Sequence, residues 1–323
     1  MSIETRAKWT DLIPDTGLRI MEVYDQGDEM YTPGIFSLIP KVTGTGAQEN
    51  YTGKTSFGEV KKFAEGDDVP TVERFKTYTT SVVFVNYGGA VKVTKNQIED
   101  RDFEAELSEM KDLSRSVNYS IDKSGAQLFN GGFSTTTAVN GYDMTWYNDG
   151  VPQFSTIHPT VVPGASTQSN ASSTGIKLSH DNLETARLAL ELQQSDNGLA
   201  LSMAGKITIV APLNLEKTGK EVTMSDLQPQ NANNAINVFK GSIDLVTSKF
   251  FDAVSGGSNT AWYLVNTQMA KMYHTERQGK RLETDVDILS KTATFTVDAR
   301  WANCSKEWKG TWGSKGDLAA YSA

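Results

Sequence analysis

The chain has 323 residues, of which 38% are hydrophobic and 22% are charged, and its formal net charge is −8. This apolar content is enough for a hydrophobic core, whereas the acidic balance excludes a surface that grips nucleic-acid phosphates by itself. Cys304 is the single cysteine, which excludes an intramolecular disulfide and is typical of a protein made in a reducing cytoplasm. No apolar run approaches the roughly 18 residues that a membrane span needs, and we see no secretion signal, so we expect no membrane association.

The first 50 residues form an irregular segment, because proline and glycine interrupt positions 14–40 every few residues. We interpret 1–50 as an arm that lies on another surface. Residues 51–98 predict a long β-hairpin, since 78–85 is rich in β-forming side chains and Gly66-Asp67-Asp68 is typical of a turn. Such a hairpin has little core of its own and needs a partner surface to be stable.

Residues 103–129 carry a helical pattern. Apolar side chains recur at helical spacing, at Phe103, Leu107, Met110, Leu113, Val117, Ile121 and Leu128. A helix of this length is roughly 40 Å long, which indicates a structural spine. Gly131 and Gly132 predict its end, because glycine tolerates a left-handed cap.

The region from 135 to 270 predicts a mixed α/β unit. A loop-like stretch over 134–178 precedes a helix that we expect to begin at Asp181, with Glu184 at capping-box spacing, and to end at Asn197-Gly198. A buried strand over 206–212 is followed by a helix that starts at Leu213, and 237–246 and 261–265 predict further strands.

The final segment, 283–312, predicts strands again, with regular alternation over 292–301. Trp301, Trp308 and Trp312 crowd into this stretch, and large aromatic side chains dominate the energetics of cores and interfaces. We therefore expect these tryptophans to be buried.

Three features suggest chemistry, and each has a simpler interpretation. Gly53-Lys54-Thr55 resembles the end of a phosphate-binding loop, but Gln48 stands where a glycine is required, so we interpret it as a turn of the hairpin. Ser155 and His158 lie close in sequence without a GxSxG nucleophile elbow, which favours a buried or hydrogen-bonded histidine. His158, His180 and His274 share no metal-ligand spacing.

Acidic side chains gather at two places, residues 98–102 and the pair Asp285 and Asp287. The first precedes the long helix, where carboxylates favour the positive end of the helix dipole, and the second alternates along a strand edge. A divalent ion at either place is the open alternative. The interpretation adopted is that the chain has no catalytic residue, no cofactor and no metal ligand, and that it is not an enzyme.

Several stretches, taken in order, resemble the major capsid proteins of tailed bacteriophages with the Hong Kong 97-type fold, and are most similar to Mu-like head subunits. The stretches are the hairpin and acidic turn up to residue 100, the helix end at 126–133, and the segments 154–159, 178–186, 207–213, 233–237, 261–265, 276–277 and 300–316. The resemblance covers residues 51 to 316.

This resemblance implies an α+β fold. Its parts are an N-terminal arm (1–50), an extended β-hairpin loop (51–98), a peripheral domain (99–134 and 271–323) with a spine helix at about 103–129, and an α/β axial domain (135–270). It implies a subunit that assembles through pentamers and hexamers into the icosahedral shell of the virion, enclosing double-stranded DNA without sequence-specific binding. Portal and separate scaffolding proteins are implied partners, a decoration protein is an open one, and assembly is expected in the host cytoplasm.

Two alternatives stay open at this point. An encapsulin-type nanocompartment shell has the same fold and is the second interpretation. Some phages with this fold also crosslink a lysine of the extended loop to an asparagine of a neighbouring subunit. Lys54, Lys61, Lys62 and Lys76 lie in the matching region, but no motif identifies a partner, so no residue is assigned.

Overall fold

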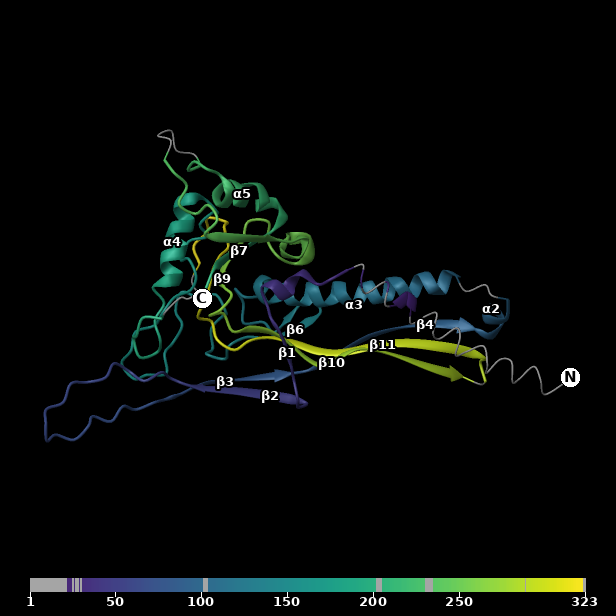
Figure 1. Cartoon of the computed structure of the whole chain (residues 1–323), viewed down its shortest axis with the longest axis horizontal. Helices are drawn as coiled ribbons and strands as arrows, with labels where there is room; N and C mark the ends of the chain where they lie inside the picture. Colours follow the sequence, from purple (N-terminus) through teal and green to yellow (C-terminus); the bar gives the residue numbers. More distant parts are fainter. Residues whose placement is uncertain are drawn as a thin grey trace.

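The structure is a computed structural model that describes residues 22–24, 26, 29, 31–100, 104–201, 205–229, 235–287 and 289–321. Within these residues the chain builds sheets of six, four and two strands. Figure 1 shows the long helix α3 running along the largest sheet, with the four-stranded sheet and helices α4 and α5 at one end of it. The loop of the two-stranded hairpin projects beyond the same end.

The largest sheet has the strand order β1-β10-β11-β6-β5, and β4 also pairs with β11. Its strands are β1 (Lys41–Thr43), β4 (Val85–Thr94), β5 (Ala138–Val139), β6 (Tyr142–Thr145), β10 (Met272–Asp287) and β11 (Thr292–Ser305). The alternation predicted for 292–301 is confirmed, because Phe295, Val297, Ala299 and Trp301 are buried while Thr296, Asp298 and Arg300 between them are half-buried. The buried face of this sheet lies against α3.

Helix α3 (Glu104–Asn130) has 27 residues and matches the helix predicted over 103–129. Leu107, Met110, Val117 and Ile121 form one apolar face that packs on β4 and β11. The short helix α2 (Lys95–Asp100) precedes it. One core cluster therefore joins the helix to the largest sheet over much of its length.

The end of α3 depends on close packing, which corrects the predicted left-handed cap. Neither Gly131 nor Gly132 has a positive φ. A Cβ at Gly131 would come within 2.6 Å of Val139, and one at Gly132 would come within 2.6 Å of the Phe154 ring. Glycine is required here because the following chain crosses directly over these positions.

The four-stranded sheet has the order β12-β9-β7-β8. Its strands are β7 (Ile207–Ala211), β8 (Ile243–Thr247), β9 (Trp262–Asn266) and β12 (Thr311–Ser314). Every residue of β7 and β9 is buried. One face packs on α4 (His180–Glu191) and α5 (Glu216–Met224), and the other joins the core around the C-terminal end of α3.

Three predicted boundaries in this unit are wrong. The N-cap of α4 is Ser179, whose hydroxyl accepts a hydrogen bond from the Asn182 N–H, so Asp181 lies in the first turn and is not the cap. The helix ends at Glu191, before Asn197-Gly198. The strand predicted over 237–246 is β8, Ile243–Thr247, and short 3₁₀ helices follow Pro212 and Ser248 as η2 (Leu213–Leu215), η3 (Lys249–Phe251) and η4 (Ala253–Ser255).

The predicted burial of the three tryptophans is confirmed, although they occupy different places. Trp301 stacks on Tyr87 with ring centroids 4.1 Å apart, inside the core under α3. Trp308 stacks on His158, and Trp312 contacts Trp262 in the core of the four-stranded sheet.

Residues 31–43 lie on the body of the same chain. The Tyr31 hydroxyl and the Ile35 N–H both donate to the carboxylate of Asp122 on α3, at 2.6 and 2.8 Å. Helix η1 (Gly34–Ser37) follows, and β1 then pairs in parallel with β10. Half of the predicted arm, including residues 1–21, lies outside the described residues.

The hairpin predicted over 51–98 is shorter in the structure. Strand β2 (Gln48–Lys54) pairs antiparallel with β3 (Lys76–Val83), and the connecting residues 55–75 contain no helix or strand. Residues 85–94 form β4, which pairs with β11 in the largest sheet. The chain therefore leaves the hairpin at Phe84, a buried residue, and enters the body.

Candidate assembly surfaces

His158 lies in a closed hydrogen-bond network. Its Nδ1 is 2.7 Å from the Asp149 carboxylate and its Nε2 is 3.0 Å from Asn170 Oδ1, and all three residues are buried. The Ser155 hydroxyl accepts from the Ile157 N–H instead of facing the imidazole. The ring also stacks on Trp308. This network holds the loops over 147–171 against the chain near Trp308, and it confirms the interpretation as a buried, hydrogen-bonded histidine.

The other residues considered as candidates for catalysis or metal binding also make hydrogen bonds within their own hairpin or turn. The Gly53 N–H donates to Thr77 Oγ1 across the hairpin, and the Thr55 N–H donates to the Phe75 carbonyl, so Gly53-Lys54-Thr55 is part of the β2–β3 hairpin. The Asp287 carboxylate accepts from the Leu289 N–H and the Ser290 hydroxyl in the turn before β11. These hydrogen bonds lower the pKa of Asp287.

The predicted acidic cluster at 98–102 is only partly described, because residues 101–103 lie outside the described residues. In the part of the chain that the structure describes, no group of three His, Cys, Asp or Glu side chains could hold a metal ion. Over the same residues, no helix is both long and apolar enough to cross a bilayer.

The loop 55–75 carries an exposed apolar surface that we call the loop patch. It consists of Phe57, Val60, Phe63 and Val69. Val60 is 86% exposed and Val69 is 70% exposed, and the loop joins none of the core clusters formed by the described residues. Four large apolar side chains on one unsupported segment are typical of a surface that another molecule covers.

A second exposed apolar surface, the tip patch, lies where α5 leads toward β8. It consists of Met224, Leu227, Ile236 and Val238, of which Ile236 is 79% exposed. Leu227 and Ile236 pair as an antiparallel bridge, and the buried Asn237 amide donates to the Val222 and Ser225 carbonyls. The patch is therefore held in place by the backbone while its side chains face solvent.

The hairpin root is the place where β2 meets the body. Lys306 Nζ lies 3.4 Å from the ring centre of Tyr51 on β2 and 4.5 Å from that of Tyr273 on β10. Burial lowers the pKa of Lys306. A cation held between two aromatic rings links the hairpin to the largest sheet.

Beside Lys306 is a largely buried charge cluster. Lys309 Nζ is 2.8 Å from Asp196 and 3.1 Å from Glu307, and Lys271 also pairs with Glu307. Burial alone would raise the pKa of Glu307, but Lys309 and Lys271 outweigh it and lower this pKa. The cluster lines the cleft between the hairpin and the body together with Tyr147.

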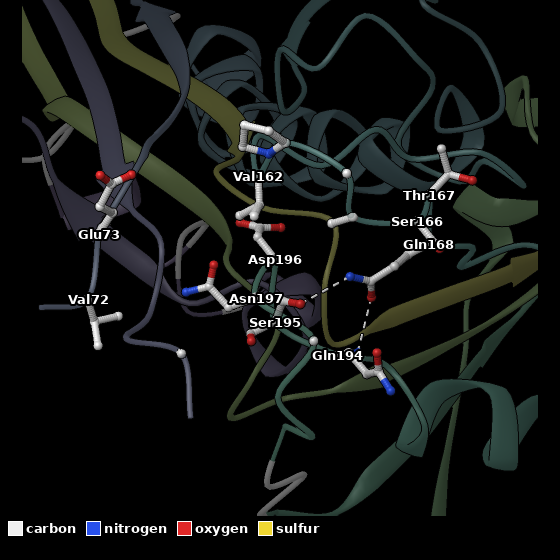
Figure 2. A pocket seen from close by; sticks show the side chains of 15 residues that line it. Val72, Glu73, Val162, Ser166, Thr167, Gln168, Gln194, Ser195, Asp196 and Asn197 are labelled. Carbon is white, nitrogen blue, oxygen red and sulfur yellow. Dashed lines mark hydrogen bonds between the residues drawn. The ribbon is translucent and has the colours of Figure 1, made fainter. Parts of the chain in front are cut away.

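The loop leaves the hairpin root over a polar groove of about 600 Å³. Figure 2 shows Val72 and Glu73 of the loop on one side and the segments around Gln168 and Ser195 on the other. The Gln168 side chain donates to the Ser195 carbonyl and accepts from the Gln194 N–H, which joins the two segments. Sequence reasoning missed this groove and the hairpin root, because their residues come from segments far apart in the chain.

Comparison with known proteins identifies the class to which this fold and these surfaces belong. The sequence model of the phage capsid protein family matches residues 77–312. The chain therefore belongs to the phage capsid protein family. No curated protein sequence matches the chain.

Solved structures support the same class. The capsid of bacteriophage JBD30 has a TM-score of 0.54 at 14% identity, covering 69% of this chain and 92% of that chain. The mature capsid of bacteriophage PhiM1 has a TM-score of 0.57 at 12% identity, covering 88% and 87%. The capsid of an empty GTA particle has a TM-score of 0.51 at 12% identity and covers 91% of both chains.

These findings confirm the α+β, Hong Kong 97-type fold and a major capsid protein that forms the shell. The encapsulin-type alternative is less supported, because the matching family is that of phage capsids. The closer similarity to Mu-like head subunits stays a prediction.

Proposed function

We propose that the subunit assembles through pentamers and hexamers into an icosahedral shell around double-stranded DNA, without catalysing a reaction. The observation that carries this proposal is the loop patch. Four apolar side chains stand on a segment that packs on no core of its own chain, so the segment gains stability when it is covered by another copy. Each contact can be modest, because repetition by symmetry multiplies it.

We propose the following role for each part of the subunit. Residues 1–50 act as an arm, and 51–98 act as the extended loop, of which β2, β3 and the loop patch are the part that reaches a neighbour. Residues 99–134 and 271–323 form the peripheral domain around α3, and 135–270 form the axial domain. The tip patch on the axial domain supports contacts around the symmetry axes, because it is apolar, exposed and rigidly held.

The proposed relation to DNA is enclosure without base recognition. A net charge of −8 opposes phosphate binding, and Glu109 and Asp112 are exposed on α3. We propose that acidic surface faces the genome, with portal and scaffolding proteins, and in some shells a decoration protein, as further partners during assembly in the host cytoplasm. A filter-binding assay with duplex DNA at about 0.15 M salt is expected to show no retention, because like charges repel.

Electron microscopy of the purified full chain tests the shell. Closed particles, tubes or sheets are expected, whereas a monomer or dimer at all concentrations would overturn the proposal. A small shell filled with a protein cargo would instead support the encapsulin-type alternative.

Trypsin digestion tests the role of the loop. Lys61 and Lys62 are exposed in the subunit and are expected to be cut in unassembled protein but protected in particles. The variant Val60→Ser/Phe63→Ser is expected to lose assembly, while the matched control Thr71→Ser in the same loop assembles normally. Equal assembly by both variants would exclude the loop patch as a subunit contact.

A further inference from the structure

His274 is a buried histidine with one satisfied and one unsatisfied ring nitrogen. Its Nδ1 is 2.7 Å from Asn303 Oδ1, and the Asn303 amide donates to Ser124 Oγ on α3 at 2.9 Å. Asn303 therefore presents its oxygen to the ring, so His274 Nδ1 carries the proton. Nε2 is then a bare acceptor, and among the described residues it has no hydrogen-bond partner.

The surroundings of Nε2 oppose a second proton. The ring contacts Phe36 of η1 edge-on with centroids 5.3 Å apart, and Trp301 lies 6.1 Å away. The Trp301 indole N–H, a donor, is also buried without a partner in the described chain. A protonated Nε2 would have no acceptor among the described residues, and burying that charge unpaired costs free energy.

The same histidine holds the segment that runs from η1 into β1. Its N–H donates to the Pro40 carbonyl at 3.1 Å, and its Cα is the register partner of Lys41 at the start of β1. Phe36 covers its ring from η1. The His274 side chain thus contacts η1, while its backbone holds the start of β1.

The charged groups that face the ring come from two strands. Lys41 on β1 and Glu276 on β10 pair with each other at 2.6 Å, so their effects on the ring oppose one another. In the described residues, η1 contributes Phe36, β11 contributes Trp301 and Asn303, and α3 contributes Ser124 behind Asn303, all of them uncharged. Burial is the largest influence and lowers the pKa of His274 below 6.5.

We infer that His274 is a proton-operated latch for β1: its neutral imidazole packs where β1 joins the sheet, and a second proton releases Lys41–Thr43 from β10. Ile35, Leu38 and Ile39 belong to the core around the C-terminal end of α3 and stay in place, so mild acid would free β1 and the start of the extended loop while the cores stay folded. This inference concerns the subunit itself and does not depend on the proposed shell.

The direction of the effect follows from linkage. Because the attached state disfavours the protonated ring, attachment is complete above the ordinary histidine pKa of about 6.5 and weakens as the pH falls below it. If the ring stays neutral when attached, the released fraction at pH 5 is about 30-fold larger than at neutral pH.

Hydrogen–deuterium exchange of the full chain between pH 7.5 and 5 tests the latch. After correction for intrinsic exchange, amides of 41–43 and 274–276 are expected to exchange up to about 30-fold faster at pH 5, while those of β7 and β9 stay protected. His274→Gln, which keeps a donor for Asn303 and does not titrate, is expected to remove the pH dependence. His180→Gln is the matched control and should retain it.

A second variant keeps the inference testable if His274→Gln does not fold. Asn303→Asp places a carboxylate beside Nδ1, stabilises the imidazolium and is expected to keep β1 (Lys41–Thr43) attached at pH 5. Exchange at 41–43 that is independent of pH in the wild type, or unchanged pH dependence in His274→Gln, would overturn the inference. Simultaneous loss of protection in β7 and β9 would also overturn it, because the event would then be global unfolding.

Discussion

The hairpin β2–β3 with its loop and the four-stranded sheet represent opposite ways of using apolar side chains. In the sheet, all residues of β7 and β9 are buried under α4, α5 and the end of α3. In the loop, Phe57, Val60 and Phe63 stand in solvent. The sheet therefore obtains its stability within one chain, whereas the loop has its apolar surface available for another. The hairpin root lies between these two regions. Substitutions in the sheet should affect the folding of the subunit, whereas substitutions in the loop should affect its assembly.

The largest effect is expected in the sheet. Trp262 is fully buried, contacts Trp312 and donates its indole N–H to the Ile176 carbonyl at 2.8 Å. Trp262→Ala leaves a cavity and an unpaired carbonyl, and is expected to lower the free energy of unfolding by about 3–5 kcal/mol. Urea denaturation of the unassembled subunit measures this. If Trp262→Ala lowered the free energy of unfolding as little as a substitution in the exposed loop, the contrast between the sheet and the loop would be wrong.

An intermediate, pH-dependent effect is expected at the hairpin root. Glu307→Gln removes the charge that Lys271 and Lys309 share, and is expected to cost about 1–3 kcal/mol near neutral pH. Because the folded pKa of Glu307 is lowered, its contribution is fully present above 4.5 and is lost as the pH falls through the folded value. Unfolding free energies of both proteins should therefore converge in acid, and a constant difference from pH 7 to 3 would refute the assignment.

A smaller effect is expected from the cation between the two tyrosines. Lys306→Met keeps the length of the side chain and removes its charge, so attachment of the hairpin should weaken by about 0.5–2 kcal/mol. Hydrogen exchange of β2 and β3 amides should accelerate while exchange of β7 is unchanged. Lys61→Met, on an exposed loop position, is the matched control and should alter neither.

The smallest effect on folding is expected in the loop patch. Val60→Ser on the unassembled subunit should change the free energy of unfolding by less than about 0.5 kcal/mol, because the side chain is 86% exposed in the subunit. Urea denaturation of Val60→Ser and Trp262→Ala under the same conditions compares their effects on the free energy of unfolding directly. A cost above about 1 kcal/mol would show that the loop is part of the subunit's own core.

Sequence patterns predicted an element correctly where its burial depends on the spacing of apolar residues within that element alone. The spacing of apolar residues in α3, the alternation of β11 and the mostly apolar run of β7 each follow from the pattern of one helix or strand. The hairpin could also be predicted, although it is shorter than expected and its root packs on the body through Val82 and Tyr51. Its second boundary was wrong because β4 follows β3 almost without a break. Periodicity describes both strands equally and does not tell which sheet each one joins.

What the sequence by itself determined was therefore helix α3, the strands β7 and β11, the absence of a recognisable catalytic motif and the family resemblance, whereas β1, β5 and β6 lie in segments predicted to be irregular. The tertiary structure alone decided that β1 pairs in parallel with β10, that Gly131 and Gly132 admit neighbouring side chains, and that Lys306 lies between Tyr51 and Tyr273. It also decided that His158 has both ring nitrogens satisfied while His274 has one. The physical reason is that local patterns fix which face of an element is apolar, whereas hydrogen-bond partners and close approaches depend on segments far apart in the chain.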